Sequence, residues 1–540
     1  MNSLTSYFRL KNNLCAKRPA LRATIMNGGI YMTKTRLAFL LLFLVTAVVI
    51  SSLLMKQATH LTQEVQRSAD EPDTLTTVFS LRPAIRFHAG ETIEDNIHTR
   101  SVREHLNIDI HYLWTAPDST FTTKLKLQLL NKREMPDIIP VRTDVVHELI
   151  DSGQFMAVDE LFAQYASPVW KKAMKEDPAV WQPYERDGKH YAIPILDYHY
   201  NSDPVMWIRE DWLEKVGLTP PSSLSELEAV LDAFTHRDPD GNGRDDTYGI
   251  AVSLQRAVNT WMADIGWVFG MYGILPEQWN LVNGTAEGEG RLEYGSIQPE
   301  AKQGLLKLKE WKEQGYFSDE ALYQDEEMAA RMFTQGKAGI VVGPAWMRYR
   351  PLDDMLAANS GVSFMAIPLP SGQSGKSYHR SSPPRNGAIL INKNIQDPEP
   401  FFRYINYLYE SGSVQAGPLN SLIPGEPVDV SDYTLIYDGA RVPSDWTQIV
   451  SEPEKSILAR QAGSRLLNEF QGPPTTTMRE KWGQLQQTER EVFLQIIYGK
   501  QDIAYFDRFA ALWKENGGDQ ITDEVNAWYR SSQSSAAAGR

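Results

Sequence analysis

Oxygen-bearing side chains recur at alternate positions of one short loop, in a pattern suited to calcium. They stand at loop positions 1, 3, 5 and 9 and belong to Asp238, Asp240, Asn242 and Asp246. Calcium takes six to eight hard oxygen ligands, and alternate residues of a tight loop can direct them inward. Gly243 occupies position 6, where such a loop turns sharply, and Arg244 at position 7 would offer its backbone carbonyl. The spacing therefore predicts a structural calcium site.

The last position of this loop departs from a complete EF-hand. Position 12 holds Gly249 in place of the glutamate that binds calcium through both oxygens. The departure argues against the helix opening of a calcium sensor. The alternative is a turn in which Asp, Asn and Gly serve backbone geometry alone. Crowded carboxylates repel one another without a cation, and this favours calcium.

Motifs for enzymatic chemistry are weak or incomplete. Residues 371–377 end like a phosphate-binding loop, but proline stands at position 370 where that motif needs glycine. The sequence has neither a His-Glu-x-x-His zinc motif nor a Gly-x-Ser-x-Gly nucleophile turn. The single cysteine, Cys15, excludes an intramolecular disulfide and a cysteine-ligated zinc site. No carboxylate pair stands out among 68 acidic residues, so an exported glycan hydrolase stays an alternative.

An uncharged apolar run, residues 37–55, follows a basic N-terminal segment, residues 1–36. Its 19 residues, at ~1.5 Å each in a helix, nearly cross a ~30 Å hydrocarbon core. Seven cations precede it, so the positive-inside rule places the N-terminus in the cytoplasm and exports the body. We expect an uncleaved signal anchor that holds the body at the outer face of the cytoplasmic membrane. A cleaved signal peptide, with secretion of the body, is the alternative, and translation could start at Met1, Met26 or Met32.

The exported part is acidic. Lys plus Arg minus Asp plus Glu gives 54 − 68 = −14 for the chain. Residues 1–56 carry eight cations and no carboxylate, so the remainder carries −14 − 8 = −22. This balance argues against nucleic acid as a partner, because phosphate contacts need clustered cations. Polar residues 56–74 read as a tether and residues 533–540 as a flexible tail.

Strand and helix patterns alternate through the body. Short runs rich in β-branched residues predict strands at 74–81, 108–113, 138–139, 339–342, 362–367 and 387–391. Ser223 and Glu226 form a capping box, and apolar residues at helical spacing predict a helix from there to about Phe234. This alternation predicts an α/β fold with mostly parallel strands.

Several stretches resemble the bacterial extracellular solute-binding proteins of family 1, the carbohydrate receptors of ABC importers. The stretches are 135–138 (MPDI), 187–194 (DGKHYAIP), 207–218 (WIREDWLEKVGL), 238–249 (DPDGNGRDDTYG), 333–346 and 517–526. Their order along residues 75–530 is similar to that of the large Firmicute-type members with a calcium loop. The chain lacks the lipobox cysteine that typical members carry after the apolar run.

The resemblance implies a two-lobed periplasmic-binding-protein-like fold (type II) of the α/β class, with a hinge and a cleft between the lobes. It implies a first lobe of residues 75–194 plus about 392–445. The second lobe would hold residues 195–391 plus about 446–532. It further implies a monomeric, non-enzymatic receptor that binds a carbohydrate, an oligosaccharide above all, and delivers it to ABC permease subunits. A membrane-tethered sensor that presents its ligand to a receptor kinase is the alternative to transport.

Sugar recognition suggests which side chains to expect in the cleft. Sugar hydroxyls need carboxylate, amide or arginine partners, and the C–H faces of sugar rings stack on aromatic side chains. The resemblance places Asp144 and Trp346 where relatives bind sugar, with Arg142 beside Asp144. Further candidates are Tyr198, Tyr200, Trp207, Trp261, Asp264 and Trp267. Each of these could instead be an ordinary core or surface residue.

Overall fold

The computed structural model describes residues 71–82, 85, 87, 89–131, 133–142, 145–282, 290–358, 361–372, 375, 377–410, 433–436 and 439–538. Contacts divide the chain into Met1–Glu71 and a compact unit, Pro72–Arg540, which is the subject below. The predicted basic segment 1–36 and apolar run 37–55 lie outside the described residues. Within the described part of the chain, no helix has the length and apolar character needed to cross a bilayer.

The first lobe is built around two small sheets. Strand β1 pairs with β2 in parallel, and β14 lies between β3 and β6, antiparallel to both. The apolar faces of these strands and of the surrounding helices form two buried clusters, which include Phe79, Trp170 and Ile389. The elements are β1 (Asp73–Leu81), α2 (Ile97–Leu106), β2 (Ile108–Pro117), α3 (Asp118–Leu130), β3 (Ile138–Val141), α4 (Val145–Asp151), α5 (Asp159–Tyr165), α6 (Pro168–Met174), β4 (Glu185–Arg186), β5 (Lys189–His190), β6 (Ile193–Leu196), β14 (Arg385–Ile391) and α13 (Glu399–Glu410).

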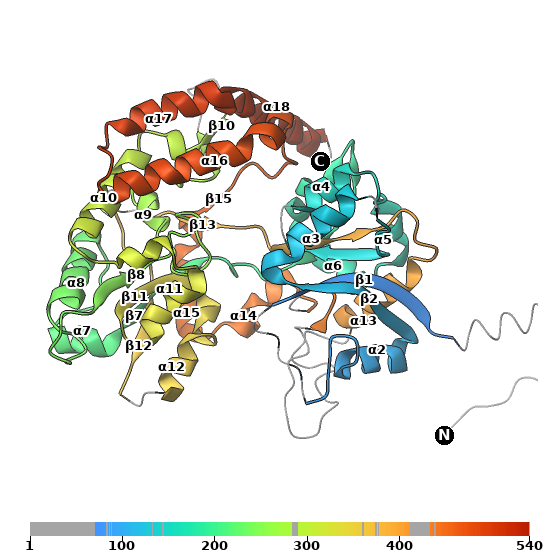
Figure 1. Cartoon of the computed structure of the whole chain (residues 1–540), viewed down its shortest axis with the longest axis horizontal. Coiled ribbons are helices and arrows are strands. Elements are labelled where there is room, and N and C mark those ends of the chain that lie inside the picture. Colours follow the sequence, from blue (N-terminus) through green and yellow to red (C-terminus); the bar gives the residue numbers. More distant parts are fainter. Residues whose placement is uncertain are drawn as a thin grey trace, which may run out of the picture. The chain divides into compact units, whose positions relative to one another are not determined.

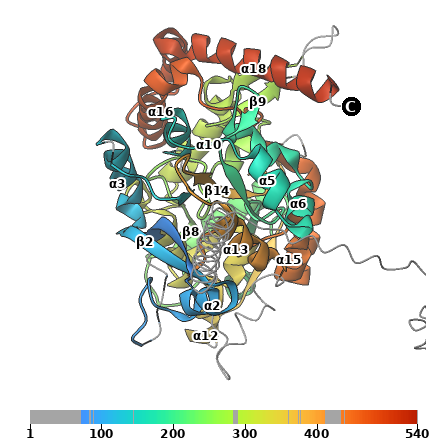
Figure 2. The same cartoon turned by 90° about the vertical axis from the view of Figure 1, so that its right-hand side faces the viewer.

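The second lobe has a four-stranded sheet in the order β12-β7-β11-β8, with helices packed around it. Its C-terminal helices cover a separate hairpin of β9 and β10; α18 contacts β10, and Figure 2 shows α18 above β9. The elements are β7 (Pro204–Arg209), α7 (Glu210–Val216), α8 (Leu224–His236), β8 (Tyr248–Ala251), α9 (Trp267–Gly270), β9 (Trp279–Val282), β10 (Arg291–Tyr294), α10 (Ala301–Glu313), α11 (Glu326–Thr334), β11 (Ala338–Pro344), α12 (Leu352–Ala358), β12 (Phe364–Ile367), β13 (His379–Ser381), α14 (Trp446–Ile449), α15 (Glu452–Gln461), β15 (Arg465–Leu467), α16 (Thr476–Ile497), α17 (Tyr505–Trp513) and α18 (Asp519–Ala538).

The chain passes between the lobes more than once, so each lobe is made of discontinuous segments (Figure 1). Strand β6 belongs to the first lobe and β7 to the second, and the chain returns through β14. The sequence-based boundary at about 392 places β14 in the second lobe. The structure moves this boundary to about 384, because β14 pairs with β3 and β6.

Most of the predicted strands and the predicted helix are present, but the expected strand direction is wrong. Among the strand pairs of the described residues, three are parallel and six antiparallel. The reason is connectivity, because β7 and β14 enter their sheets from the other lobe and run against their neighbours. A pattern of apolar residues reports burial and does not report strand direction.

The capping-box prediction for α8 is confirmed. The Ser223 hydroxyl accepts the amide of Glu226, whose carboxylate accepts the Ser223 amide. The apolar side of α8 packs into the largest buried cluster of the second lobe through residues such as Leu227 and Leu231. Gly249 in β8 faces this helix, where a Cβ atom would lie 2.8 Å from the Leu231 side chain. Close packing of strand on helix therefore accounts for the glycine at loop position 12.

Candidate functional site

Three segments that join the lobes lie beside one another and form the hinge region. The Asp197 amide donates to the Pro384 carbonyl at 2.9 Å, and the His199 amide donates to the Pro443 carbonyl at 3.0 Å. Arg441 also forms an ion pair with Asp197. The three crossings are thus tied together by backbone bonds and by one partly buried ion pair.

Two tryptophans form a stacked pair next to this hinge region. The rings of Trp261 and Trp346 lie 5.6 Å apart between centroids, with an interplanar angle of 21°. Trp261 is 45% exposed, and Trp346 is half-buried. The Trp346 indole donates to the Asn201 carbonyl at 3.1 Å, which ties the stack to the first crossing. The pair therefore presents a rigid aromatic surface of the kind on which a sugar ring stacks.

One buried carboxylate, Asp264, and one partly buried carboxylate, Glu277, hold the loop that carries Trp261. Glu277 accepts the amides of Val258 and Asn259 at 2.9 and 3.0 Å, one on each oxygen. Asp264 accepts the amides of Thr260 and Gly266 on one oxygen, at 3.0 and 3.2 Å. Such bonds satisfy backbone donors that the irregular loop would otherwise leave unpaired.

Burial shifts the titration of both loop carboxyls. Desolvation raises the pKa of Asp264 to about 6 and raises the pKa of Glu277 above its ordinary value. The loop also joins the central sheet, because the Asp264 amide donates to the Val342 carbonyl in β11 at 3.1 Å. Strand β11 leads directly into the turn that carries Trp346, so this bond places the two tryptophans side by side.

The tyrosines after the first crossing each lie under an arginine. Arg441 lies 5.0 Å from the ring centre of Tyr198, and Arg465 lies 4.5 Å from that of Tyr200. Tyr200 also meets Trp446 edge to face, with centroids 4.7 Å apart. Desolvation raises the pKa of Tyr198 above its ordinary value, so its hydroxyl stays protonated at neutral pH. The two tyrosines therefore offer aromatic edges beside the hinge, and Tyr198 adds a neutral hydroxyl.

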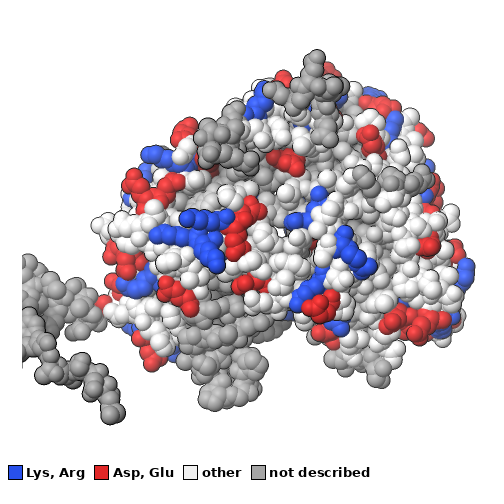
Figure 3. All heavy atoms as spheres, turned by 180° about the vertical axis from the view of Figure 1, so that it is seen from behind, with Lys and Arg blue, Asp and Glu red and all other residues white. Residues whose placement is uncertain are grey.

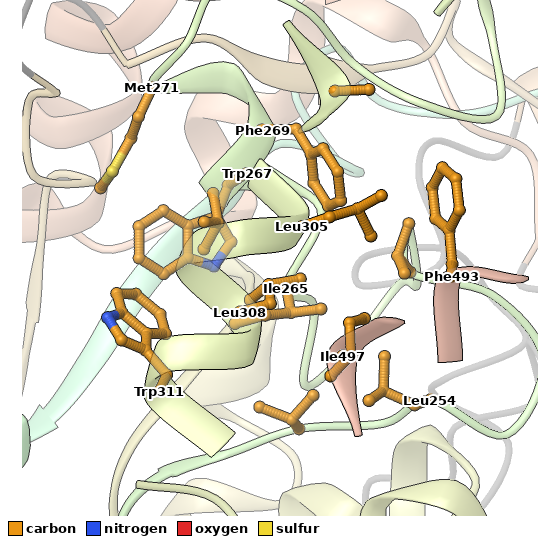
Figure 4. Packing of buried hydrophobic residues seen from close by; sticks show 14 of the residues in the cluster. Leu254, Ile265, Trp267, Phe269, Met271, Leu305, Leu308, Trp311, Phe493 and Ile497 are labelled. Carbon is orange, nitrogen blue, oxygen red and sulfur yellow. The ribbon is translucent and has the colours of Figure 1, made fainter. Parts of the chain in front are cut away.

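Three candidate residues are buried away from solvent. Trp207 in β7 has no exposed surface, and Trp267 in α9 is 1% exposed. Figure 4 shows Trp267 packed among the apolar side chains of the second-lobe core, with Trp311 beside it. Asp264 is 5% exposed and is occupied by the backbone bonds described above. In this structure these side chains support the fold and do not line an open surface.

The remaining candidates belong to the first lobe. Arg142 follows β3, is exposed, and donates through Nε to the Asn386 side chain in β14 at 3.1 Å. Asp144 lies outside the described residues. Arg441, Arg465, Trp446 and Glu277 were not predicted from the sequence. No local motif marks them, since their partners lie far away in the chain.

The aspartate loop hydrogen-bonds to itself. The Asn242 amide nitrogen donates to Asp240 at 2.7 Å and to Asp246 at 3.0 Å. Asp238 accepts the amides of Gly241 and Gly243. These oxygens have the hard-donor chemistry that calcium takes. Across the described ranges, however, no group of three or more His, Cys, Asp or Glu side chains is arranged to hold a metal ion.

Known proteins with a similar sequence or fold were then compared with this chain. A sequence model of the bacterial extracellular solute-binding protein family matches residues 89–415. Lipoprotein LipO of Bacillus subtilis (strain 168) is 22% identical over 80% of this chain and 89% of its own length. The fructooligosaccharide ABC transporter substrate-binding protein FusA of Streptococcus pneumoniae is 26% identical, over 50% of this chain and 49% of its own length.

Solved structures show the same fold. The alginate-binding protein AlgQ2, crystallised without calcium ion, matches with a TM-score of 0.66 and 17% identity, over 85% of this chain and 98% of its own. FusA in complex with kestose matches with a TM-score of 0.65 and 18% identity, over 86% of this chain and all of its own. At these identities the likeness establishes a two-lobed α/β fold.

Proposed function

Because the chain belongs to the family of bacterial extracellular solute-binding proteins, we propose that it binds an oligosaccharide and delivers it to the permease subunits of an ABC importer. FusA, a relative by sequence and by fold, is a fructooligosaccharide ABC transporter substrate-binding protein. The protein would act as a receptor that binds and releases the sugar without chemical change. Closure of the two lobes about the hinge would trap the solute.

The observation that carries this proposal is the partly exposed Trp261–Trp346 stack beside the crossings. Tyr198 and Tyr200 extend the aromatic surface along the hinge. Arg142, which follows β3 of the first lobe, would bind sugar hydroxyls, and Asp144 is proposed for the same role from its place in the family resemblance. Trp207, Trp267 and Asp264 are left out of the proposed site because they are buried.

The test begins with a thermal-shift screen of the purified full chain against a carbohydrate library, with calcium present. The best ligand is then titrated by calorimetry into wild type and into Trp346→Ala. We expect the affinity of the variant to fall at least tenfold, which is ~1.4 kcal/mol. Tyr323→Ala is the matched control, because Tyr323 is a 75% exposed aromatic outside the proposed site. The proposal fails when no carbohydrate raises the melting temperature, or when Trp346→Ala binds as tightly as wild type while folded.

We further propose that the loop from Asp238 to Asp246 binds a structural calcium ion. Asp238, Asp240, Asn242 and Asp246 would donate side-chain oxygens and Arg244 its carbonyl. The side-chain oxygens of the loop accept hydrogen bonds from its own amide groups, and on calcium binding they would bind the cation in place of these donors. One solved structure similar in fold is a FusA EF-hand mutant, with a TM-score of 0.64 and 18% identity.

Mass action on a site that exists only in the folded state predicts that calcium raises the melting temperature and that a chelator lowers it. Asp240→Asn should reduce this calcium-dependent shift. Asp245→Asn should keep it, because position 8 of the loop contributes no ligand. An identical melting curve with calcium and with EDTA would refute the assignment.

The N-terminal segment completes the proposal. We infer that residues 37–55 anchor the protein in the cytoplasmic membrane and place the body outside the cell. The uncharged run and the cations before it support this orientation. Mass spectrometry of the protein from native membranes should detect a chain that begins at or before Arg36. A mature N-terminus after residue 50 would show cleavage instead.

A further inference from the structure

Two arginines pair with one carboxylate where α4 of the first lobe meets the start of α16 in the second, and a third arginine and a histidine belong to the same charged region. Asp151 ends α4, and its two oxygens pair with Arg186 and Arg479, each at 3.0 Å. His147 lies one turn earlier on α4. Arg186, Arg385 and Arg479 all act on His147 electrostatically, so the five groups form one cluster.

The cluster carries an excess of positive charge. Three arginines and one aspartate leave 3 − 1 = +2, although the whole chain carries −14. Burial, followed by the charge of Arg186, lowers the pKa of His147 to about 4, so the imidazole is neutral near pH 7. A local excess of this kind on an acidic protein attracts anions.

Two buried nitrogen atoms in the cluster lack hydrogen-bond partners among the described residues. They are Nη2 of Arg186 and Nδ1 of His147. The other groups of Arg186 are occupied, since Nη1 donates to the carbonyls of Pro183 and Glu185. Buried polar atoms normally have a partner, and Nη2 of Arg186 is always a donor, so an acceptor oxygen from a bound molecule would complete its bonding.

The cluster spans both lobes and can be reached from solvent. Arg186 and Arg385 belong to β4 and β14 of the first lobe, whereas Arg479 belongs to α16 of the second. Arg385 also donates to Gln471 of the second lobe at 3.3 Å. The side chains of Arg479 and Asp151 are 47% and 32% exposed. Figure 3 shows the face opposite to that of Figure 1, with Lys and Arg side chains on both sides of the hollow in its middle.

One residue of the cluster is next in sequence to a hydrogen-bond partner of Arg142, a residue of the proposed sugar site. Arg385 is the neighbour in β14 of Asn386, and Asn386 accepts the Arg142 side chain. A carboxylate already fits between the two lobes at this point, because Asp151 bridges Arg186 and Arg479. Guanidinium groups bind carboxylates through paired, charge-assisted hydrogen bonds.

On the premise of the proposed carbohydrate-receptor function, we propose that the solute is an acidic, uronate-bearing oligosaccharide whose carboxylate binds to Arg186, Arg385 and Arg479. One such carboxylate contacts arginines of both lobes and therefore favours the closed arrangement. Neutral oligosaccharides keep the aromatic contacts but lose this bridge between the lobes.

The experiment compares three kinds of probe on the purified full chain. They are uronate oligosaccharides built from galacturonate, glucuronate or mannuronate, their neutral counterparts of equal length, and inorganic phosphate. We expect at least one uronate series to bind at least tenfold more tightly than its neutral counterpart. This preference should shrink at high salt, since screening weakens an interaction between charges.

Variants then locate the preference. Arg479→Gln and Arg385→Gln should each weaken uronate binding at least tenfold and leave the affinity for neutral sugar within twofold. Lys481→Gln is the matched control, because it removes the same charge from the same helix while its side chain lies against Gly517. Bound uronate should also raise the pKa of His147 in an NMR titration, since it adds negative charge beside the imidazole. Melting curves identify a variant that fails to fold, and Arg479→Gln tests the proposal at the more exposed position.

The outcomes separate this inference from the function on which it rests. Binding of neutral sugars at equal or greater affinity, or uronate affinity unchanged in both arginine variants, overturns the acidic-solute inference and leaves a carbohydrate receptor. Inorganic phosphate that binds as tightly as the uronate oligosaccharide also overturns the acidic-solute inference, because the cluster would then be a simple anion site. A protein that binds no carbohydrate in the wider screen contradicts the proposed function itself.

Discussion

The second lobe contains two tryptophan pairs in opposite environments, although Trp261 of one pair and Trp267 of the other belong to the same short segment. Trp267 and Trp311 are each 1% exposed and pack within the apolar core, with centroids 6.1 Å apart. Trp261 is 45% exposed and stacks on Trp346. The first pair is held by apolar neighbours and the second by a loop whose amides bind carboxylates. An aromatic residue therefore serves stability or recognition according to what holds it in place.

The largest expected effect separates the two pairs by stability. Trp267→Ala removes a fully buried ring and should lower the free energy of unfolding by about 3–5 kcal/mol. Trp261→Ala removes a partly exposed ring and should cost less than about 1 kcal/mol. Urea denaturation of the full chain measures both values. Equal losses in the two variants would erase the distinction between a core pair and a surface pair.

A chain of hydrogen bonds connects the core to the loop of the exposed pair. Glu489 in α16 accepts the hydroxyls of Tyr294 and Ser296, and Ser296 accepts the Glu277 amide at 2.6 Å. Burial, then the charge of Glu277, raises the pKa of Glu489 to about 8, so this carboxyl is protonated at pH 7 in the folded protein.

This shift makes stability depend on pH. In the unfolded chain Glu489 ionises near its ordinary pKa of 4.5, whereas in the folded protein it keeps its proton until about pH 8. Its contribution to the free energy of unfolding is therefore complete below pH 4.5 and is lost as pH rises to about 8. Because one pKa unit corresponds to ~1.4 kcal/mol, the loss amounts to a few kcal/mol. The Glu489→Gln variant should not show this loss of unfolding free energy between pH 4.5 and about 8.

The measurement is the free energy of unfolding of wild type and Glu489→Gln at several pH values. Asp264 has a raised pKa in both proteins, whereas Glu277 interacts with Glu489, so the difference between the two curves reports the titration of the Glu489–Glu277 pair. We expect the variant to become the more stable protein above about pH 8. Parallel curves from pH 5 to pH 8 would show that Glu489 titrates normally.

The smallest effect concerns only the support of the exposed pair. Glu277→Gln replaces one of two acceptor oxygens by an amide group that cannot accept the Val258 or Asn259 amide. The loop should loosen, with faster amide exchange at residues 258–261 and carbohydrate affinity about fivefold lower, or ~1 kcal/mol. Glu310→Gln, an exposed change in α10 of the same lobe, should do neither. Unchanged exchange and affinity in Glu277→Gln would show that the carboxylate does not position Trp261.

Local patterns were sufficient for many individual elements. The capping box of Ser223 and Glu226 predicted α8 because both partners lie within one helical turn. The β-branched run at 74–81 predicted β1, since alternation and burial leave a direct mark on residue type. Ordered motifs likewise identified the family, because short stretches in a set order are visible without coordinates.

Candidate site residues were harder to judge from the sequence, and Trp261, Asp264 and Trp267 show why. They lie within one short segment, yet the first is exposed, the second binds backbone amides and the third is in the core. Residue type alone cannot tell these fates apart, because each depends on segments distant in the chain. Glu277 went unnoticed for the same reason, since its role consists of contacts with residues 18 and 19 positions away.

The sequence by itself determined the residue types, the charge division, the helix caps and the family of this protein, since these are local or ordered along the chain. Only the tertiary structure decided strand direction, the membership of β14 in the first lobe and the meeting of Arg186, Arg385 and Arg479. These features depend on how the chain crosses between lobes and brings distant segments together. Long-range contacts of this kind leave no periodic signal in the order of the amino acids.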